Sequence, residues 1–279
     1  MKILRSLPVF LFFSFMALAN YSQRIITLAP ALTEIVFDLG YGDKIVGNTK
    51  FCNFPAESEK ITKVGGYLDM NLELLTGLEP DIIFFYPEHS QKLSVLSGRS
   101  KLIELKHNTI KDLLNSILKI GEELQIRKRA VVLKNNIISG LKAVKNRPSS
   151  GKKIKTLIII GRDPSQLKNI TIAGKGDFIN EILEISGGIN GYNGNIAYPV
   201  LSIESFVKVD PEVIIEFSLF EQESKNIKVL KLWENYNFIK AVQKKNIYQV
   251  REDFWMRPGP RIVKIAESLY KLLHKNKNI

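Results

Sequence analysis

Residues 70–85 read MNLELLTGLEPDIIFF, and residues 201–217 read LSIESFVKVDPEVIIEF. Each stretch begins with a residue that favours a helix N-cap, Asn71 in the first and Ser202 in the second. A glutamate follows two positions later in both, at Glu73 and Glu204. An apolar helix-like run, a proline beside an acidic residue and a buried strand then come in the same order. The chain therefore encodes one helix-to-strand unit twice, which predicts two corresponding lobes.

The residues from Arg24 onward alternate strand-like runs with helix-like segments. RIITLAPALTEIVFDLG, from Arg24 to Gly40, reads as a strand, a tight Ala-Pro turn and a helix that ends at a C-cap glycine. Further strands are expected at KIVGNT (44–49), DIIFFY (81–86) and KLIEL (101–105). Their apolar runs are continuous, which is typical of strands buried on both faces of a parallel sheet. This order predicts a sheet covered by helices.

The middle of the chain has almost no strand signal. Apolar residues from Ile110 to Val144 follow helical stripes, and Gly121 is expected to kink or separate two helical pieces. The second piece, Ile126 to Asn146, is long for a globular helix. Strand and helix signals then resume at TLIIIG (156–161), DFINEILEISGG (177–188), EVIIEF (212–217), NIYQV (246–250) and RIVKIAESLYKLLHK (261–275). The predicted fold class is α/β, with two small lobes, each a parallel-type sheet covered by helices, joined by one long interlobe helix.

The predicted domain boundaries follow from these segments. Residues 20–108 form the N-terminal lobe, 109–149 the interlobe helical segment and 150–279 the C-terminal lobe. Residues 1–19 are expected to be a signal peptide, because Lys2 and Arg5 precede an apolar run that is too short to span a bilayer. Ala17-Leu18-Ala19 offers the small-x-small cleavage pattern, so we expect cleavage near Ala19 and export to the periplasm. No cysteine lies at that point to carry a lipid anchor.

Composition narrows the classes of function. The chain has a formal net charge of +12, but its lysines and arginines are scattered and form no patch interleaved with aromatic residues. That distribution does not favour nucleic-acid binding and is better explained by a solvated surface. Cys52 is the single cysteine and cannot form an internal disulfide. Two lobes of this kind place strand ends and loops face to face, where ligands bind in α/β sheets.

An ordered set of segments resembles a known family. RIITLAPALTEIVFDLG, FCNFPAESEKITKVGGYLDMNLELLTGLEPDII, GRDP, SGG and RPGPRIV look like the helical-backbone (class III) solute-binding proteins of ABC importers, and within them the corrinoid-binding branch. The resemblance covers nearly all of the chain after the expected signal peptide. It implies a monomeric receptor with no cofactor of its own, which captures cobalamin or a related corrinoid between its lobes. The receptor would deliver this ligand to an ABC permease dimer in the inner membrane.

The resemblance also implies roles for individual residues. A corrinoid has apolar ring faces and an amide fringe, so its site needs aromatic walls and a few hydrogen-bonding groups. Alignment with the corrinoid branch assigns ligand contacts to Phe51, Tyr67, Tyr86, Tyr198, Asp253, Phe254, Trp255, Met256 and Arg257. Ala29, Pro30 and Ala31, at the end of the first strand, would line the floor of the cleft. Each of these aromatics has an alternative interpretation as a core or turn residue. We favour Arg257 for the ligand and Arg261 for structure.

The paired glutamates also gain a role from the resemblance. Glu73 and Glu204 align with surface glutamates that pair with arginines of the permease dimer. Matched charges on two related lobes suit a twofold-symmetric partner, and such pairs fix register and speed encounter. The alternative is purely structural, because an acidic residue in the first turn stabilises a helix by about 0.3–1 kcal/mol.

Competing functions remain open from the sequence. A haem or ferric-siderophore receptor would share the scaffold, and Tyr67, Tyr86 or Tyr198 could ligate haem iron. A metal-ion receptor is disfavoured because only three histidines exist. An exported enzyme is the alternative of a different class, but no nucleophile elbow, P-loop or HExxH motif appears, and Gly174-Lys175-Gly176 is a poor dinucleotide loop. We therefore expect a binding protein without catalytic residues or a resident metal.

Overall fold

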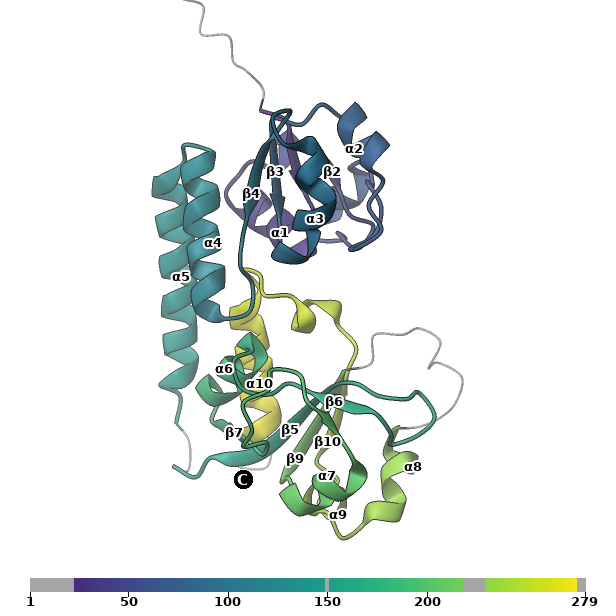
Figure 1. Ribbon diagram of the computed structural model, residues 1–279. Helices are drawn as coiled ribbons and strands as arrows, with labels where there is room; N and C mark the ends of the chain where they lie inside the picture. The colour runs from purple at the N-terminus through teal and green to yellow at the C-terminus, as the bar shows by residue number, and fades with distance from the viewer. Residues whose placement is uncertain (1–22, 149–150, 218–228, 275–279) are drawn as a thin grey trace, which may run out of the picture.

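The computed structural model describes residues 23–148, 151–217 and 229–274. They form two α/β lobes, one above the other in the view of Figure 1, with two long helices along one side. The expected signal peptide lies outside the described residues. Among the helices described, none is both long enough and apolar enough to cross a membrane.

The N-terminal lobe contains a four-stranded sheet in the order β2-β1-β3-β4, with every neighbouring pair parallel, as predicted. Helix α1 covers one face, and helices α2 and α3 cover the other. The elements are β1 (Ile25–Thr27), α1 (Pro30–Asp38), β2 (Ile45–Asn48), α2 (Leu72–Gly77), β3 (Ile82–Phe85), α3 (Ser90–Leu93) and β4 (Lys101–Glu104). The predicted strands all form, because each carries apolar side chains into a layer on both sides of the sheet.

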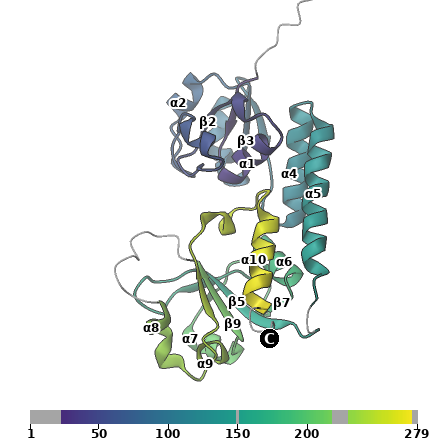
Figure 2. The ribbon, with the colours of Figure 1, turned by 180° about the vertical axis from the view of Figure 1, so that it is seen from behind.

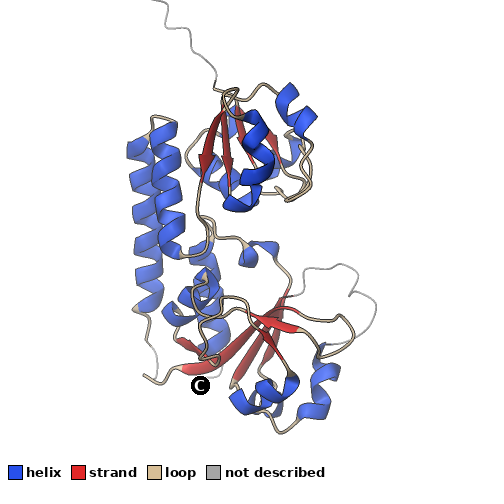
Figure 3. Cartoon of the chain, in the orientation of Figure 1, coloured by secondary structure: helices blue, strands red, loops and turns tan. Residues whose placement is uncertain are grey.

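The C-terminal lobe contains a six-stranded sheet in the order β10-β9-β5-β6-β8, with β7 also paired to β5. Its strands are drawn in red in the lower part of Figure 3. Strands β10, β9, β5 and β7 are parallel, while β6 and β8 are antiparallel additions. The sequence did not predict β6, β7 or β8. The strands are β5 (Ile154–Gly161), β6 (Ile170–Ile172), β7 (Gly188–Asn190), β8 (Val200–Leu201), β9 (Val213–Phe217) and β10 (Ile247–Val250). The helices are α6 (Phe178–Ile185), α7 (Ile203–Val209), α8 (Val229–Trp233), α9 (Lys240–Gln243) and α10 (Ile262–His274).

The two lobes are joined by helices α4 (Ile110–Glu123) and α5 (Arg127–Lys145), which lie side by side (Figures 1 and 2). The expected long interlobe helix is α5, and α4 is its antiparallel neighbour. At one end Ile110 N donates to Glu181 Oε2 of the C-terminal lobe, 2.6 Å away. At the other end Arg129 Nη1 donates to Leu39 O of the N-terminal lobe, 3.2 Å away. The pair therefore contacts both lobes.

Gly121 does not separate the two helices, contrary to the expectation from the sequence. It lies inside α4, and the break falls after it, where Gln125 adopts a left-handed φ of 58°. A Cβ at Gly121 would lie 2.3 Å from the Cβ of Ala130 on α5. The glycine therefore permits the close approach of α4 and α5.

The hydrophobic core continues from one lobe into the other. One cluster of buried side chains includes Leu32 of α1, Ile117 of α4, Ile137 of α5 and Ile265 of α10. The opposite face of each sheet has a separate cluster, around Leu75 in the N-terminal lobe and Phe206 in the C-terminal lobe. Because packed interiors transmit strain and do not deform freely, this shared core makes the connection between the lobes stiff.

The repeated unit seen in the sequence is a repeated unit in space. Leu75 in α2 and Phe206 in α7 are both fully buried and lie at equivalent positions. The residues before the two prolines, Glu79 and Asp210, both adopt left-handed φ angles, 44° and 46°. The strand registers correspond too, because Ile25 pairs with Ile82 and, at the same sequence offset, Thr156 pairs with Val213. The predicted correspondence of the two lobes is present in the backbone.

Candidate functional site between the lobes

The carboxyl ends of the parallel strands of the two lobes face each other (Figure 1). Strands β1, β2 and β3 end on the side of the N-terminal lobe that faces the C-terminal lobe, and β5, β9 and β10 end on the facing side of their own sheet. Loops at strand carboxyl ends bind ligands in α/β sheets. The residues after these strands are therefore the first candidates for a site.

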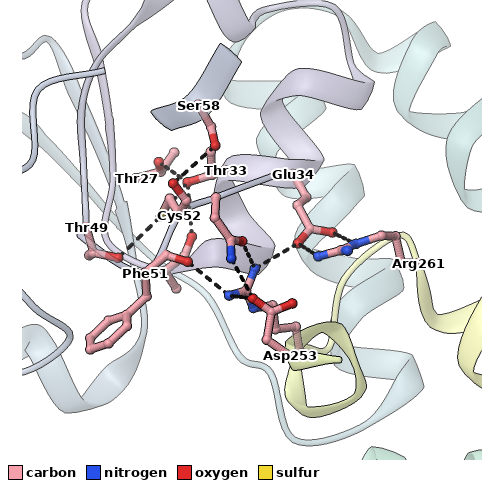
Figure 4. Close-up of polar contacts among 12 residues, drawn as sticks. Thr27, Thr33, Glu34, Thr49, Phe51, Cys52, Ser58, Asp253 and Arg261 are labelled. Atoms are coloured by element: carbon pink, nitrogen blue, oxygen red, sulfur yellow. Dashed lines mark hydrogen bonds and ion pairs between the residues drawn. The ribbon is translucent and has the colours of Figure 1, made fainter. Parts of the chain in front are cut away.

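The loop after β2 presents Phe51 on a firmly held backbone. Its ring is 48% exposed, whereas the neighbouring Cys52 is buried. Cys52 Sγ accepts a hydrogen bond from Thr33 Oγ1 at 3.1 Å and forms another with Thr49 Oγ1 at 3.3 Å (Figure 4). Lys63 Nζ donates to Cys52 O at 2.9 Å. The buried thiol thus anchors the loop that carries the exposed aromatic ring.

Tyr67 belongs to a polar and aromatic cluster at the end of β3. Its hydroxyl donates to Glu88 Oε1, and its ring packs edge-on against His89 with centroids 4.8 Å apart. Glu88 also pairs with His107, whose Nε2 lies 3.2 Å from Glu88 Oε1. The Tyr86 ring is buried and lies 4.1 Å from the His107 ring, centroid to centroid. These side chains hold Tyr67 in one orientation.

Tyr198 is the counterpart of Tyr67 in the C-terminal lobe. Tyr67 precedes the capping residue Asn71 by four positions, and Tyr198 precedes Ser202 by four. The Tyr198 ring is 46% exposed, and its hydroxyl donates to Oδ2 of the fully buried Asp177. Asp177 caps α6, because its Oδ1 accepts from Ile179 N at 2.7 Å. Each lobe therefore presents a tyrosine whose hydroxyl is held by a carboxylate.

The pKa of each tyrosine is affected by charged or ionisable groups of the other lobe. Burial, followed by the hydrogen bond to Glu88, raises the pKa of Tyr67, and nearby Tyr198 adds to the rise. Burial, followed by the hydrogen bond to Asp177, raises the pKa of Tyr198, with a further contribution from the charge of Glu88. Burial raises the pKa of Asp177 despite the hydrogen bond from Tyr198. The two tyrosine–carboxylate pairs thus lie within electrostatic range of each other across the lobes.

A second set of contacts joins the lobes through two arginines near the start of α10. Arg261 binds Glu34 of α1 at two points, with Nε to Oε2 at 2.8 Å and Nη2 to Oε1 at 2.6 Å (Figure 4). Arg257 Nη1 lies 3.7 Å from Glu34 Oε1 and donates to Asn53 Oδ1 at 2.7 Å. Glu34 is only 2% exposed. A buried carboxylate of the N-terminal lobe thus binds two cations of the C-terminal lobe.

Arg257 also fixes the loop that carries Phe51. Its Nη2 donates to Phe51 O at 3.0 Å and to Asp253 Oδ2 at 2.5 Å. Asn53 Nδ2 donates to the same Asp253 oxygen at 2.7 Å. Arg257 and Asp253 therefore bind protein groups of both lobes, and a contact of either residue with a ligand stays a prediction.

Several other residues expected at the ligand are buried in the structure. Ala29, Ala31, Tyr86, Phe254 and Trp255 are each at most 5% exposed. Gly259 of the C-terminal lobe packs over Ala31, since a Cβ there would lie 3.4 Å from the Ala31 Cβ. Phe254 lies under the Arg261 guanidinium, 5.0 Å from ring centroid to Cζ. The partly exposed members of the predicted set are Pro30, Phe51, Tyr67, Tyr198, Asp253, Met256 and Arg257.

Sequence reasoning did not identify Glu88, His107 or Asp177. Glu88 follows the predicted strand that ends at Tyr86, and Asp177 is the first residue of the predicted helix of residues 177–188. Both could therefore have been proposed as site residues from the sequence. Their pairing with tyrosines depends on the fold. In the parts of the chain that the structure describes, no group of three or more His, Cys, Asp or Glu side chains is arranged to hold a metal ion.

The two glutamates of the repeated unit are exposed at matching positions. Glu73 lies in the first turn of α2, where Asn71 Oδ1 accepts from Leu74 N at 3.0 Å. Glu204 lies in the first turn of α7, where Ser202 Oγ accepts from Ser205 N at 3.3 Å. Both helices lie on the side of the molecule away from α4 and α5 (Figure 2). The matching geometry is compatible with docking and with a structural role in helix capping.

Two surface cavities lie away from the tyrosines. The larger, about 810 Å³, lies beside the turn between α4 and α5 and includes Tyr41, Asp43 and Arg129 in its lining. The smaller, about 220 Å³, lies beside the end of α5 and includes Lys145 and His274. Neither cavity is lined by a residue that was predicted to bind ligand, so neither is part of the interlobe site.

The fold and the facing loops define a class of protein, the two-lobed α/β solute-binding proteins. The family described as periplasmic binding protein matches residues 25–254, so the chain belongs to that family. The chain is 27% identical over 264 residues to an uncharacterized ABC transporter substrate-binding lipoprotein, YvrC, of Bacillus subtilis, covering 89% of this chain and 80% of that protein. It is 26% identical over 284 residues to the vitamin B12-binding protein of Vibrio parahaemolyticus, covering 98% of each.

Solved structures share the fold. The periplasmic haem-binding protein HutB of Vibrio cholerae superposes with a TM-score of 0.78 over 91% of this chain and 99% of that chain, at 21% identity. An identity this low establishes the fold alone. Membership of the family makes this chain a binding protein of the ABC-importer type, and its ligand has to be argued from its own residues.

Proposed function

We propose that this protein captures cobalamin or a related corrinoid between its lobes and delivers it to the permease of an ABC importer. The observation that carries the proposal is the pair formed by Tyr67 and Tyr198. They occupy equivalent positions on facing lobes, both rings are partly exposed, and each hydroxyl is held by a carboxylate. Aromatic faces on two opposed walls suit a flat ring system that is bound between them. The likeness to vitamin B12-binding proteins over nearly the whole chain supports the same ligand class.

The proposal extends to export of the chain and to its contact with the permease. The chain would be exported by the peptide at residues 1–19, be cleaved near Ala19 and act in the periplasm as a monomer. Glu73 and Glu204 would contact arginines of a permease dimer, because equal charges on equivalent helices match a twofold-symmetric surface. No turnover of the ligand is expected, and the corrinoid is cargo rather than a cofactor.

Titration calorimetry of the purified mature chain tests the ligand. We expect cyanocobalamin or dicyanocobinamide to bind with a dissociation constant in the nanomolar range, about −12 kcal/mol. Haemin and a ferric siderophore are the competing ligands on the same scaffold. Tight haemin binding without any corrinoid heat would make the protein a haem receptor instead.

Two tyrosine variants test the location of the site. Tyr67→Ala and Tyr198→Ala should each weaken corrinoid binding by about tenfold or more, since an aromatic contact contributes ~0.5–1.5 kcal/mol beyond its buried area. Phe238→Ala is the matched control, because that residue is 54% exposed but lies just before α9, where its ring packs against Tyr236. Equal losses in all three variants would place the ligand elsewhere.

A further inference from the structure

The two partly exposed tyrosines have already used their only hydrogen-bond donors. A phenol has one O–H, and those of Tyr67 and Tyr198 donate to Glu88 and Asp177. What remains on each hydroxyl is the acceptor side, and the carboxylates that hold them are themselves acceptors when ionised. The walls of the proposed site thus offer a ligand lone pairs rather than protons.

The protons are held firmly on the tyrosines. Burial, together with the neighbouring carboxylate, raises the pKa of both phenols, which opposes formation of a phenolate. Burial alone would raise the pKa of Glu88, but the hydrogen bond from Tyr67 and the charge of His107 outweigh it and the pKa is lowered. Glu88 therefore stays ionised at neutral pH. A tyrosine in this state is also a poor ligand for ferric iron.

Basic groups close to the two pairs are bound to protein acceptors. Lys92 Nζ donates to Leu68 O, and Lys175 Nζ donates to Asn193 O at 3.4 Å. His107 pairs with Glu88, and Arg257 is bound by Glu34, Asp253 and the Phe51 carbonyl. A carboxylate on a ligand would meet acceptors and negative charge here, at a cost that grows in a low-dielectric site. An amide N–H would meet acceptors that it can pair with.

We propose that the two tyrosine–carboxylate pairs, Tyr67–Glu88 and Tyr198–Asp177, form a hydrogen-bond-acceptor rim that selects a corrinoid by its amide N–H groups and rejects tetrapyrroles that carry carboxylates. This inference rests on the proposed function and explains how the protein would distinguish one flat macrocycle from another. Glu88 and Asp177 are positioning residues in this view, because they set the direction in which each phenol donates.

A comparison of two ligands that share one ring tests the inference. Dicyanocobinamide carries amides around the corrin ring, and dicyanocobyrinic acid carries carboxylic acids at the same places. We expect the wild-type protein to bind the acid at least 100-fold more weakly at neutral pH. Glu88→Gln with Asp177→Asn should reduce this preference at least tenfold, mainly by improving the binding of the acid. Both substitutions preserve side-chain shape and retain an oxygen that can accept from the phenol.

The controls keep the outcome unambiguous. Glu57→Gln with Glu234→Gln removes two exposed carboxylates that are not partners of Tyr67 or Tyr198 and should leave the preference unchanged. If the wild-type protein binds both ligands within tenfold, or if the Glu88 and Asp177 variant keeps the full preference, the acceptor rim is refuted while corrinoid capture stands. If neither corrinoid binds, the proposed function and the inference fail together. Thermal melts of each variant establish that it is folded.

Discussion

Glu34 and Arg261 form a two-point ion pair that joins helix α1 of one lobe to the residue before helix α10 of the other. The carboxylate is 2% exposed, and Arg257 approaches one of the same oxygens at 3.7 Å. A fork-to-fork contact of this kind fixes geometry as well as charge. The lobes are therefore connected by this ion pair between α1 and the start of α10, and also along one side by α4 and α5.

Removal of the shared carboxylate should destabilise the protein. Glu34→Gln leaves both arginines without their buried partner, so we expect the free energy of unfolding to fall by about 3 kcal/mol, near the low end for a broken buried pair. Urea unfolding measures the change. Glu267→Gln is the matched control, because its pair with Arg147 is 2.8 Å long but half exposed and should contribute below about 1 kcal/mol. Similar losses in the two variants would contradict the role of the buried pair.

The close approach of α4 and α5 gives a second prediction. Gly121→Ala should lower the free energy of unfolding by about 1–3 kcal/mol, since its Cβ would overlap that of Ala130. Gly77→Ala in α2 has nothing within 4 Å of the new Cβ and should be neutral or stabilising by up to about 1 kcal/mol. Combining Gly121→Ala with Ala130→Gly should recover part of the loss in a double-mutant cycle. An additive double mutant would show that the two positions do not clash.

The paired surface glutamates give a third prediction. Glu73→Ala with Glu204→Ala should leave ligand affinity in solution unchanged but slow association with the permease, because exposed complementary charges act mainly on the association rate. Surface plasmon resonance at two salt concentrations measures this, and the wild-type rate should fall as salt rises. Glu57→Ala serves as an exposed acidic control. A collapse of ligand affinity in the double variant would overturn the docking role.

The buried carboxylate of Asp177 gives a prediction that depends on pH. Burial raises its pKa in the folded protein. At a pH above its ordinary pKa, the folded state therefore pays a free-energy penalty for holding the ionised carboxylate. Lowering the pH through the raised pKa protonates Asp177 and removes that penalty. Asp177→Asn can still cap α6 through its side-chain oxygen. The variant should therefore melt at a higher temperature than wild type near pH 7.5, with the difference shrinking toward pH 4. A difference that grows as the pH falls would contradict the sign.

Much of the fold was predictable because its main features are local in sequence. The repeated cap, helix, proline and strand of residues 70–85 and 201–217 indicated two lobes, and the buried runs at β3 and β9 identified their strands. Strands β6, β7 and β8 were missed because each has only two or three residues, too few to show a period. Gly121 was misread because a glycine that breaks a helix and one that permits close packing look alike in sequence.

The candidate site was predictable only in part, because its contacts join distant residues. The aromatic positions could be proposed, but the sequence does not distinguish a buried Trp255 from a half-exposed Tyr198. The partners of Arg257 on the N-terminal lobe lie more than 200 residues away in sequence, so its role in joining the lobes could not be seen. The carboxylates that hold Tyr67 and Tyr198 come from segments with no sequence correspondence and emerge only in space.

That mismatch between equivalent tyrosines and unrelated carboxylates has a consequence for the cargo. Glu88 follows β3 on one side, whereas Asp177 caps α6 on the other, so the twofold relation of the scaffold is broken at the proposed binding site. A bound macrocycle whose upper and lower surfaces differ would contact two unlike walls. Its two flipped orientations would then differ in binding free energy, so this duplicated scaffold would present the ligand to the permease in one orientation.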